Sequence, residues 1–137
     1  MALAAPSAAS APAIVSVRGL AKTYPGGVEA LSGLDLDFPK GKLTAILGPS
    51  GCGKTTLLKI IAGLLPATSG EVLVHGRKVT GPGPERAFVF QDFALLPWAT
   101  VIRNVAFGLE LRGMAREEGE AVAQRNIEQV GLQGYEN

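Results

Sequence analysis

The first third of the chain shows the period-two alternation of β-strands. In residues 14–20 (IVSVRGL) β-branched residues alternate with polar ones, and in residues 28–38 large apolar residues alternate with two aspartates near the end. A glycine-containing turn at residues 24–27 (YPGG) separates the two segments. This pattern predicts two half-exposed antiparallel strands joined by a turn.

In the middle of the chain the pattern changes to a continuous apolar run followed by a helical one. Residues 43–47 (LTAIL) are typical of a strand buried on both faces of a parallel sheet. In residues 54–65 apolar side chains recur at helical spacing (Leu57, Leu58, Ile61 and Leu65), and Pro66 is expected to end the helix. Further strands are predicted at residues 71–75 and 87–90, which together indicate an α/β fold.

The last third predicts two amphipathic helices. The first, over residues 100–112, has Thr100 as its N-cap and Gly113 as its stop, with an apolar stripe at Val101, Val105 and Leu109. The second, over residues 117–130, ends before a glycine and has its stripe at Ala123, Ile127 and Val130. No internal repeat is visible, so the helices and strands belong to a non-repetitive domain.

Composition narrows the class of protein. A chain of 137 residues that is 47% hydrophobic has the apolar content of one globular domain at most, here residues 14–137. A net charge of +1 gives no electrostatic reason to expect nucleic acid as a partner. The single cysteine excludes an intrachain disulfide and fits a reducing cytoplasm.

Residues 1–13 lack the cationic start and the apolar core of a signal peptide, and they are interpreted as a flexible leader. No apolar run in the sequence is long enough to cross a membrane.

The candidate chemistry begins at residues 48–55 (GPSGCGKT), which match the pattern glycine, four residues, glycine, lysine, then serine or threonine. Glycines let successive backbone N–H groups converge on an anion, and the start of the following helix adds its partial positive charge. The lysine contributes a full charge, and a threonine hydroxyl suits Mg²⁺. The predicted phosphate ligands are Gly48, Pro49, Ser50, Gly51, Cys52, Gly53, Lys54, Thr55 and Thr56.

This loop identifies a ligand class and not a biological task. Kinases, GTPases, motors and transport ATPases all share it, and a glycine-rich turn between a strand and a helix can also match it by chance. Further motifs are needed to choose among these alternatives.

Three further features make the chain resemble the ABC ATPases, in the order that this family uses them. They are Tyr24 in KTYPGG, residues 67–76 (ATSGEVLVHG), and Gln91 in FVFQDFALLPW. The resemblance implies that Tyr24 stacks on the adenine of ATP and that Gln91, with Thr55, holds Mg²⁺ and positions the attacking water, as the catalytic glutamine of the family's Q-loop. Taken alone, Tyr24 could be an ordinary hairpin tyrosine and Gln91 a solvated surface residue.

Residues 91–113 are most similar to the ATPases of nitrate, sulfonate and taurine importers. The resemblance implies a peripheral subunit on the cytoplasmic face of the bacterial membrane that binds ATP between two copies of itself. Its partners would be a membrane-spanning permease and, indirectly, a solute-binding protein. An apolar run just after Gln91 is the expected permease contact, with core packing as the alternative: Phe93, Leu95, Leu96, Pro97 and Trp98.

The chain departs from the family pattern in stopping before the signature motif, the Walker B aspartate, the catalytic glutamate and the switch histidine. His75 comes too early to replace the last of these and is expected on the surface. Because phosphoryl transfer depends on positioning and charge, ATP binding is expected without appreciable hydrolysis by this chain alone. The predicted fold is an α/β P-loop NTPase core of the ABC ATPase type with an N-terminal antiparallel β subdomain, truncated before the signature motif.

Two other interpretations remain open from sequence. The chain could be a non-catalytic nucleotide-binding fragment or one half of a split gene, or it could be a P-loop GTPase or small-molecule kinase, although it lacks the NKxD string of GTPases. In P-loop folds the strand that bears the Walker B aspartate lies beside the strand before the phosphate-binding loop, and that neighbour is missing from this sequence. An unpaired apolar strand exposes its backbone N–H and C=O groups, so we expect the isolated chain to be marginally stable. Cooperative thermal unfolding of a soluble monomer would contradict that expectation.

Overall fold

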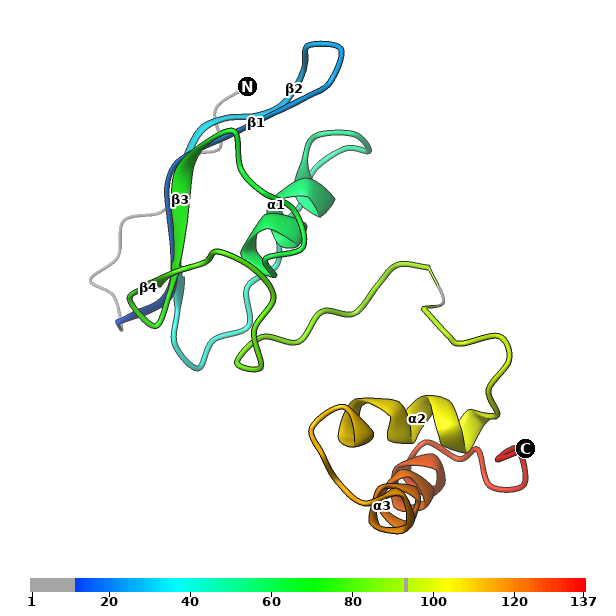
Figure 1. Ribbon diagram of the computed structural model, residues 1–137. Coiled ribbons are helices and arrows are strands. Elements are labelled where there is room, and N and C mark those ends of the chain that lie inside the picture. The colour runs from blue at the N-terminus through cyan, green and yellow to red at the C-terminus, as the bar shows by residue number, and fades with distance from the viewer. Residues whose placement is uncertain (1–11, 93) are drawn as a thin grey trace. The chain divides into compact units, whose positions relative to one another are not determined.

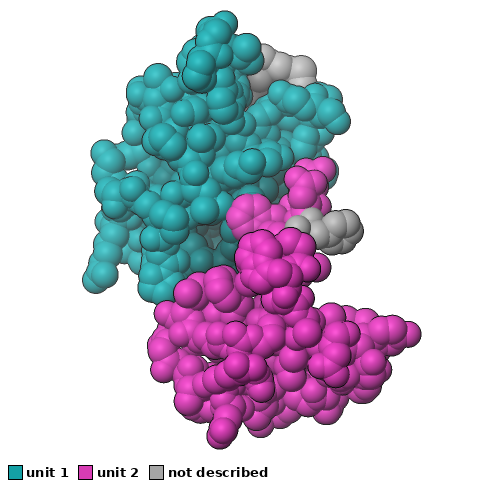
Figure 2. All heavy atoms as spheres, turned by 45° about the vertical axis from the view of Figure 1, so that its right-hand side comes forward, with its two compact units in different colours: residues 1–88 teal, residues 89–137 magenta. Residues whose placement is uncertain are grey.

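The computed structural model describes residues 12–92 and 94–137. The chain divides into two compact units, a first that ends at Phe88 and a second that runs from Val89 to Asn137, which Figure 2 colours separately. The expected leader lies outside the described residues except for its last two positions, and Phe93 also lies outside them.

The first unit is built on a four-stranded antiparallel sheet in the order β2-β1-β3-β4 (Figure 1). Its strands are β1 (Ala13–Tyr24), β2 (Val28–Pro39), β3 (Ser69–Val74) and the short β4 (Arg77–Lys78). The first three confirm predicted strands, and β1 is longer than predicted. In β2 the alternation is also confirmed, because its leucines and phenylalanine turn toward the core while both aspartates are exposed. His75 follows β3 as an exposed residue with a left-handed φ of 51°.

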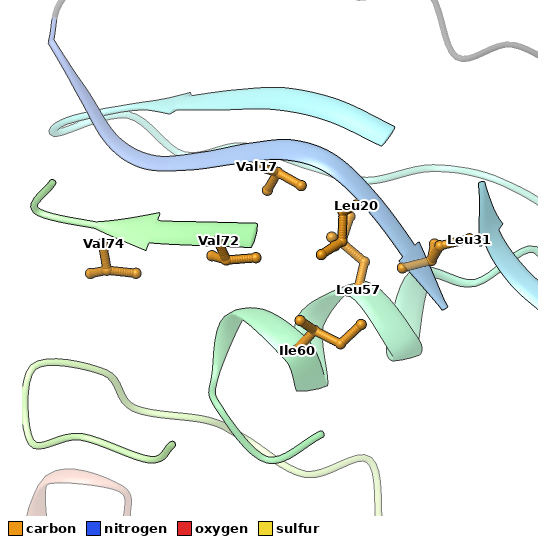
Figure 3. Packing of buried hydrophobic residues seen from close by; sticks show 7 residues of the cluster. All are labelled: Val17, Leu20, Leu31, Leu57, Ile60, Val72 and Val74. Carbon is orange, nitrogen blue, oxygen red and sulfur yellow. The ribbon is translucent and has the colours of Figure 1, made fainter. Parts of the chain in front are cut away.

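One helix, α1 (Lys54–Ile61), packs against this sheet. Figure 3 shows its Leu57 and Ile60 pointing toward side chains of β1, β2 and β3. Burying a side chain of this size contributes about 1.5–3 kcal/mol, so these contacts hold the helix on the sheet. The core cluster of the unit consists of Val17, Leu20, Leu31, Leu57, Ile60, Val72 and Val74.

The end of α1 corrects the sequence prediction. The helix stops before Gly63, which has a φ of 78° and whose N–H donates to the Ile60 carbonyl at 3.0 Å, while the Leu64 N–H donates to the Lys59 carbonyl at 2.9 Å. This is the Schellman arrangement that a left-handed glycine makes possible, and it acts before Pro66 is reached. Leu58, expected on the apolar stripe, is 44% exposed.

The strands predicted at residues 43–47 and 87–90 do not form. Leu43 and Leu47 are 101% and 82% exposed, and Val89 is 93% exposed. A strand of this composition is stabilised by neighbours on both sides, and the strands formed by the described residues all belong to the antiparallel sheet. The prediction of these two strands was therefore wrong, because the strands among the described residues offer them no pairing partner.

The second unit contains the two predicted helices, α2 (Val101–Glu110) and α3 (Arg116–Gln129). The Thr100 side chain caps α2 by accepting from the Arg103 N–H, and left-handed glycines follow both helices. The predicted stripes were partly wrong, because Val105 is 38% and Val130 is 69% exposed. The helices meet instead at small residues, where a Cβ built on Gly119 would lie 3.9 Å from that of Ala106. Among the described residues, no helix is long and apolar enough to cross a membrane.

Candidate nucleotide-binding site

The loop over residues 48–53 leads into α1 with its main chain held in a shape that suits an anion. Gly51 and Gly53 have φ values of 79° and 94°, in the left-handed region that glycine favours. Gly53 also lies so close to β2 that an added Cβ would be 2.5 Å from the Ala30 carbonyl oxygen. Gly53 is the N-cap of α1, makes no side-chain cap, and is followed by no acidic residue in the first turn. The positive end of the helix is therefore left for an external negative charge.

Lys54 folds back over this loop. Its Nζ donates to the carbonyl oxygens of Gly48 at 2.8 Å and Pro49 at 2.6 Å, and lies 3.5 Å from the Sγ of Cys52. An ammonium group has three N–H donors, and thiol sulfur is a weak acceptor. Two donors thus fix the ammonium above the loop, and the third has only a weak partner that an anionic oxygen could replace.

Tyr24 and α1, which come from distant parts of the sequence, are brought together in the first unit. The Tyr24 hydroxyl lies 3.1 Å from the Thr56 Oγ1, within hydrogen-bond distance. Lys22 Nζ lies 5.5 Å from the centroid of the Tyr24 ring, in the range of a cation–π contact, and also donates to the Pro66 carbonyl. An aromatic ring, a hydroxyl and the start of a helix therefore share one site.

The other predicted site residues can be placed by their exposure and their local structure. Ser50, Cys52 and Thr55 are exposed on or next to the loop. Gln91 belongs to the second unit, where it is an exposed residue in a bend and does not follow a strand, contrary to the prediction. Within the first unit, the structure brings Tyr24 to the helix that follows the loop over residues 48–53.

Sequence reasoning missed the part that Lys22 plays at this site. Its ammonium lies over the Tyr24 ring and at the same time donates to the carbonyl oxygen of Pro66, in the turn after α1. The signal was available in the alternation of β1, because residues two apart in a strand lie on the same face.

A family model described as ABC transporter matches residues 31–137. The chain belongs to the ABC transporter ATP-binding family. The match begins after Tyr24, so this tyrosine lies outside the matched residues, whereas residues 48–56 and Gln91 lie inside them.

Curated relatives of this ABC family member are ATP-binding proteins. The chain is 49% identical to an uncharacterized ABC transporter ATP-binding protein of Methanocaldococcus jannaschii over 110 residues, which are 80% of the chain and 41% of the relative. It is 47% identical to the taurine import ATP-binding protein TauB of Escherichia coli over 111 residues, which are 81% of the chain and 44% of the relative. The chain thus spans about two fifths of the length of these relatives.

Solved ABC cassettes share the fold. An ATP-binding cassette solved as a dimer in a post-hydrolysis state with ADP and Pi gives a TM-score of 0.79 at 31% identity, covering 90% of the chain and 60% of that structure. The CbiO1 protein of Clostridium perfringens, part of an ABC transporter complex, gives 0.70 at 27% identity, covering 91% of the chain and 53% of that structure. The predicted fold class, the N-terminal part of an ABC ATPase, is confirmed.

Proposed function

We propose that this chain supplies the nucleotide-binding part of an ATP-binding subunit of an ABC importer. The main support for this proposal is the contact between the Tyr24 hydroxyl and Thr56, because it brings an aromatic residue to the first turn of α1, whose start has no side-chain cap. A flat apolar ring and an anion-binding loop are the two chemistries that a purine triphosphate requires.

In this proposal the backbone of residues 48–53 and the start of α1 bind the phosphates of ATP. Lys54 keeps its two carbonyl contacts and turns its third N–H from Cys52 Sγ to a phosphate oxygen. Because Lys22 lies over one face of Tyr24, adenine would stack on the opposite face. The loop is already shaped by its glycines, so little ordering is required on binding.

Magnesium fits the hydroxyl chemistry of the same site. Thr55 is exposed in the first turn of α1, and its hydroxyl oxygen is a hard ligand of the kind that Mg²⁺ accepts. Bound there, Mg²⁺ would neutralise phosphate charge. We assign Gln91 to the same ion and to water positioning on the resemblance alone, and we assign no hydrolytic step to the residues of the loop.

The proposed partners follow from the family. A second copy would close over the nucleotide, and a permease at the cytoplasmic side of the membrane would contact the exposed residues Leu95 and Trp98, which are 63% and 82% exposed. The similarity to TauB supports a small anion such as taurine, another sulfonate or nitrate as the solute. A solute-binding protein would deliver it to the permease.

Alkylation of Cys52 tests nucleotide binding without any hydrolysis. Cys52 is the single cysteine of the chain, and its exposed Sγ lies 3.5 Å from Lys54 Nζ, where a phosphate is proposed to bind. With Mg-ATP at ten times its dissociation constant, we expect labelling by iodoacetamide to slow about tenfold, because only about one site in eleven stays free.

The control for this experiment separates the phosphates from the base. Inorganic triphosphate with Mg²⁺ should protect Cys52, whereas adenosine at the same concentration should not. Equal labelling rates with and without Mg-ATP would contradict the proposed site.

A further inference from the structure

In the segment before α2, residues 95–100, some side chains are half-buried and others are exposed. Leu96 and Ala99 are half-buried, whereas Leu95 and Trp98 are 63% and 82% exposed. This segment is neither helix nor strand, so its backbone N–H and C=O groups need hydrogen-bond partners from elsewhere. The Asn104 side chain supplies several of those partners.

Asn104 lies in the first turns of α2 and uses both ends of its amide on this segment. Its Oδ1 accepts from the Leu96 N–H at 2.7 Å. Its Nδ2, which carries two hydrogens, lies within hydrogen-bond distance of three carbonyl oxygens, those of Leu96 at 3.2 Å, Ala99 at 3.1 Å and Thr100 at 3.0 Å, so that one hydrogen is shared. One half-buried side chain therefore binds the segment at both ends, and we call these hydrogen bonds the Asn104 clamp.

The helix that carries Asn104 is itself firmly placed in the second unit. Ala106, two residues after Asn104, is completely buried against α3. The Ile102 N–H donates to the Glu136 carbonyl at 3.0 Å, which ties the start of α2 to the end of the chain. A short turn closes the segment too, because the Ala99 N–H donates to the Leu96 carbonyl at 3.0 Å.

We infer that Asn104 is a positioning residue that holds Leu95 and Trp98 outward in the arrangement a permease helix contacts. The identity of the partner rests on the proposed function, whereas the fixing of the segment by Asn104 does not. Side chains held in place before binding lose less conformational entropy when a partner binds, so the Asn104 clamp would strengthen the contact without touching the partner.

The first test uses the chain itself, because Trp98 is its single tryptophan. We compare the time-resolved fluorescence anisotropy of Trp98 in the unsubstituted chain, in Asn104→Ala and in Asn104→Asp, with Asn126→Ala as the matched control. Asn126 is an exposed asparagine on α3, and alanine is the better helix former, so neither alanine variant weakens its helix intrinsically. The aspartate variant keeps the shape of the side chain, but an ionised carboxylate donates no hydrogen bonds.

We expect the amplitude of the nanosecond anisotropy component to rise about twofold in Asn104→Ala and Asn104→Asp, because a released loop moves on that timescale. Exchange of the Leu96 amide hydrogen should become about tenfold faster in Asn104→Ala, since a hydrogen bond of about 1.4 kcal/mol is lost. Asn126→Ala should change neither. Unchanged Trp98 motion and Leu96 exchange in both Asn104 variants, with the helical circular dichroism intact, would overturn the inference.

The second test addresses the partner, in the assembled transporter. Asn104→Ala should reduce the permease that co-purifies with the subunit by about the same factor as Trp98→Ala, about fivefold or more for an exposed aromatic anchor. Asn126→Ala should leave the yield unchanged. If Trp98→Ala has no effect while Asn104 still controls Trp98 motion, the proposed docking fails and the clamp stands. If Trp98→Ala weakens the complex and Asn104→Ala does not, positioning by Asn104 is refuted.

Discussion

Lys54→Ala is expected to lower the affinity for Mg-ATP about 100-fold or more, because hydrogen bonds to charged groups contribute about 1.5–3 kcal/mol each and about 1.4 kcal/mol is a factor of ten. The substitution removes a full positive charge from above the loop and frees the Gly48 and Pro49 carbonyls that the ammonium now satisfies. Without the ammonium, the partial negative charges of those two carbonyl oxygens are no longer neutralised and would repel the incoming phosphates. Both effects act on the same step, which is why this is the largest expected loss of binding.

The matched control for Lys54 is in the same helix. Lys59 is an exposed lysine in the last turn of α1, at the opposite end from the loop. Titration with a fluorescent ATP analogue should show a loss for Lys54→Ala and less than about a twofold change for Lys59→Ala, since exposed charges contribute little. An equal effect of the two substitutions, or none for Lys54, would mean that the loop does not bind phosphate as described.

Gly53→Ala is expected to destabilise the first unit by about 2–4 kcal/mol, because it combines left-handed strain with a steric clash. At a φ of 94° a Cβ is unfavourable, and here it would also lie 2.5 Å from the Ala30 carbonyl oxygen and 2.9 Å from Leu31 Cδ2. The loop must move away from β2, so the start of α1 loses the orientation that faces the phosphates.

The Gly51→Ala substitution distinguishes the cost of the left-handed backbone conformation from the cost of a steric clash. Gly51 has a similar φ of 79°, but nothing lies within 4 Å of a Cβ built on it. It should therefore cost only about 1 kcal/mol, the strain of the left-handed conformation. Urea titration followed by far-ultraviolet circular dichroism compares the two, and a smaller loss for Gly53→Ala than for Gly51→Ala would show that the close approach to β2 does not exist.

The parts of the fold that sequence predicted are those that depend on local signals. Strand β1, the alternation of β2, the Thr100 cap and the glycines after α2 and α3 each depend on signals within a few residues, and each was confirmed. The strands at residues 43–47 and 87–90 depend instead on neighbours in a sheet, which no local pattern reports. The buried face of α3 was predicted correctly at Ala123 and Ile127, whereas Val105 was wrongly placed on the buried face of α2. The two helices approach each other at Gly119 and Ala106, whose small size no apolar stripe reports.

The candidate site divides in the same way. Residues 48–56 follow one another in sequence, so a motif was sufficient to find them. The proximity of Tyr24 to Thr56 depends on how the β1–β2 hairpin and α1 pack, and only the family resemblance suggested it before the structure did. The Asn104 clamp has no motif of its own, since its bonds all go to backbone groups several residues earlier in the chain.

Amide NMR shifts of the chain on titration with Mg-ATP show directly whether the backbone of residues 48–53 and the start of α1 bind the phosphates of a nucleotide. We expect the largest shifts on the N–H groups of Gly51, Gly53, Lys54 and Thr55 and smaller ones at Tyr24. Inorganic triphosphate should reproduce the shifts of the loop without those of Tyr24. Shifts scattered over the surface, or none at the loop with saturating Mg-ATP, would contradict phosphate binding there.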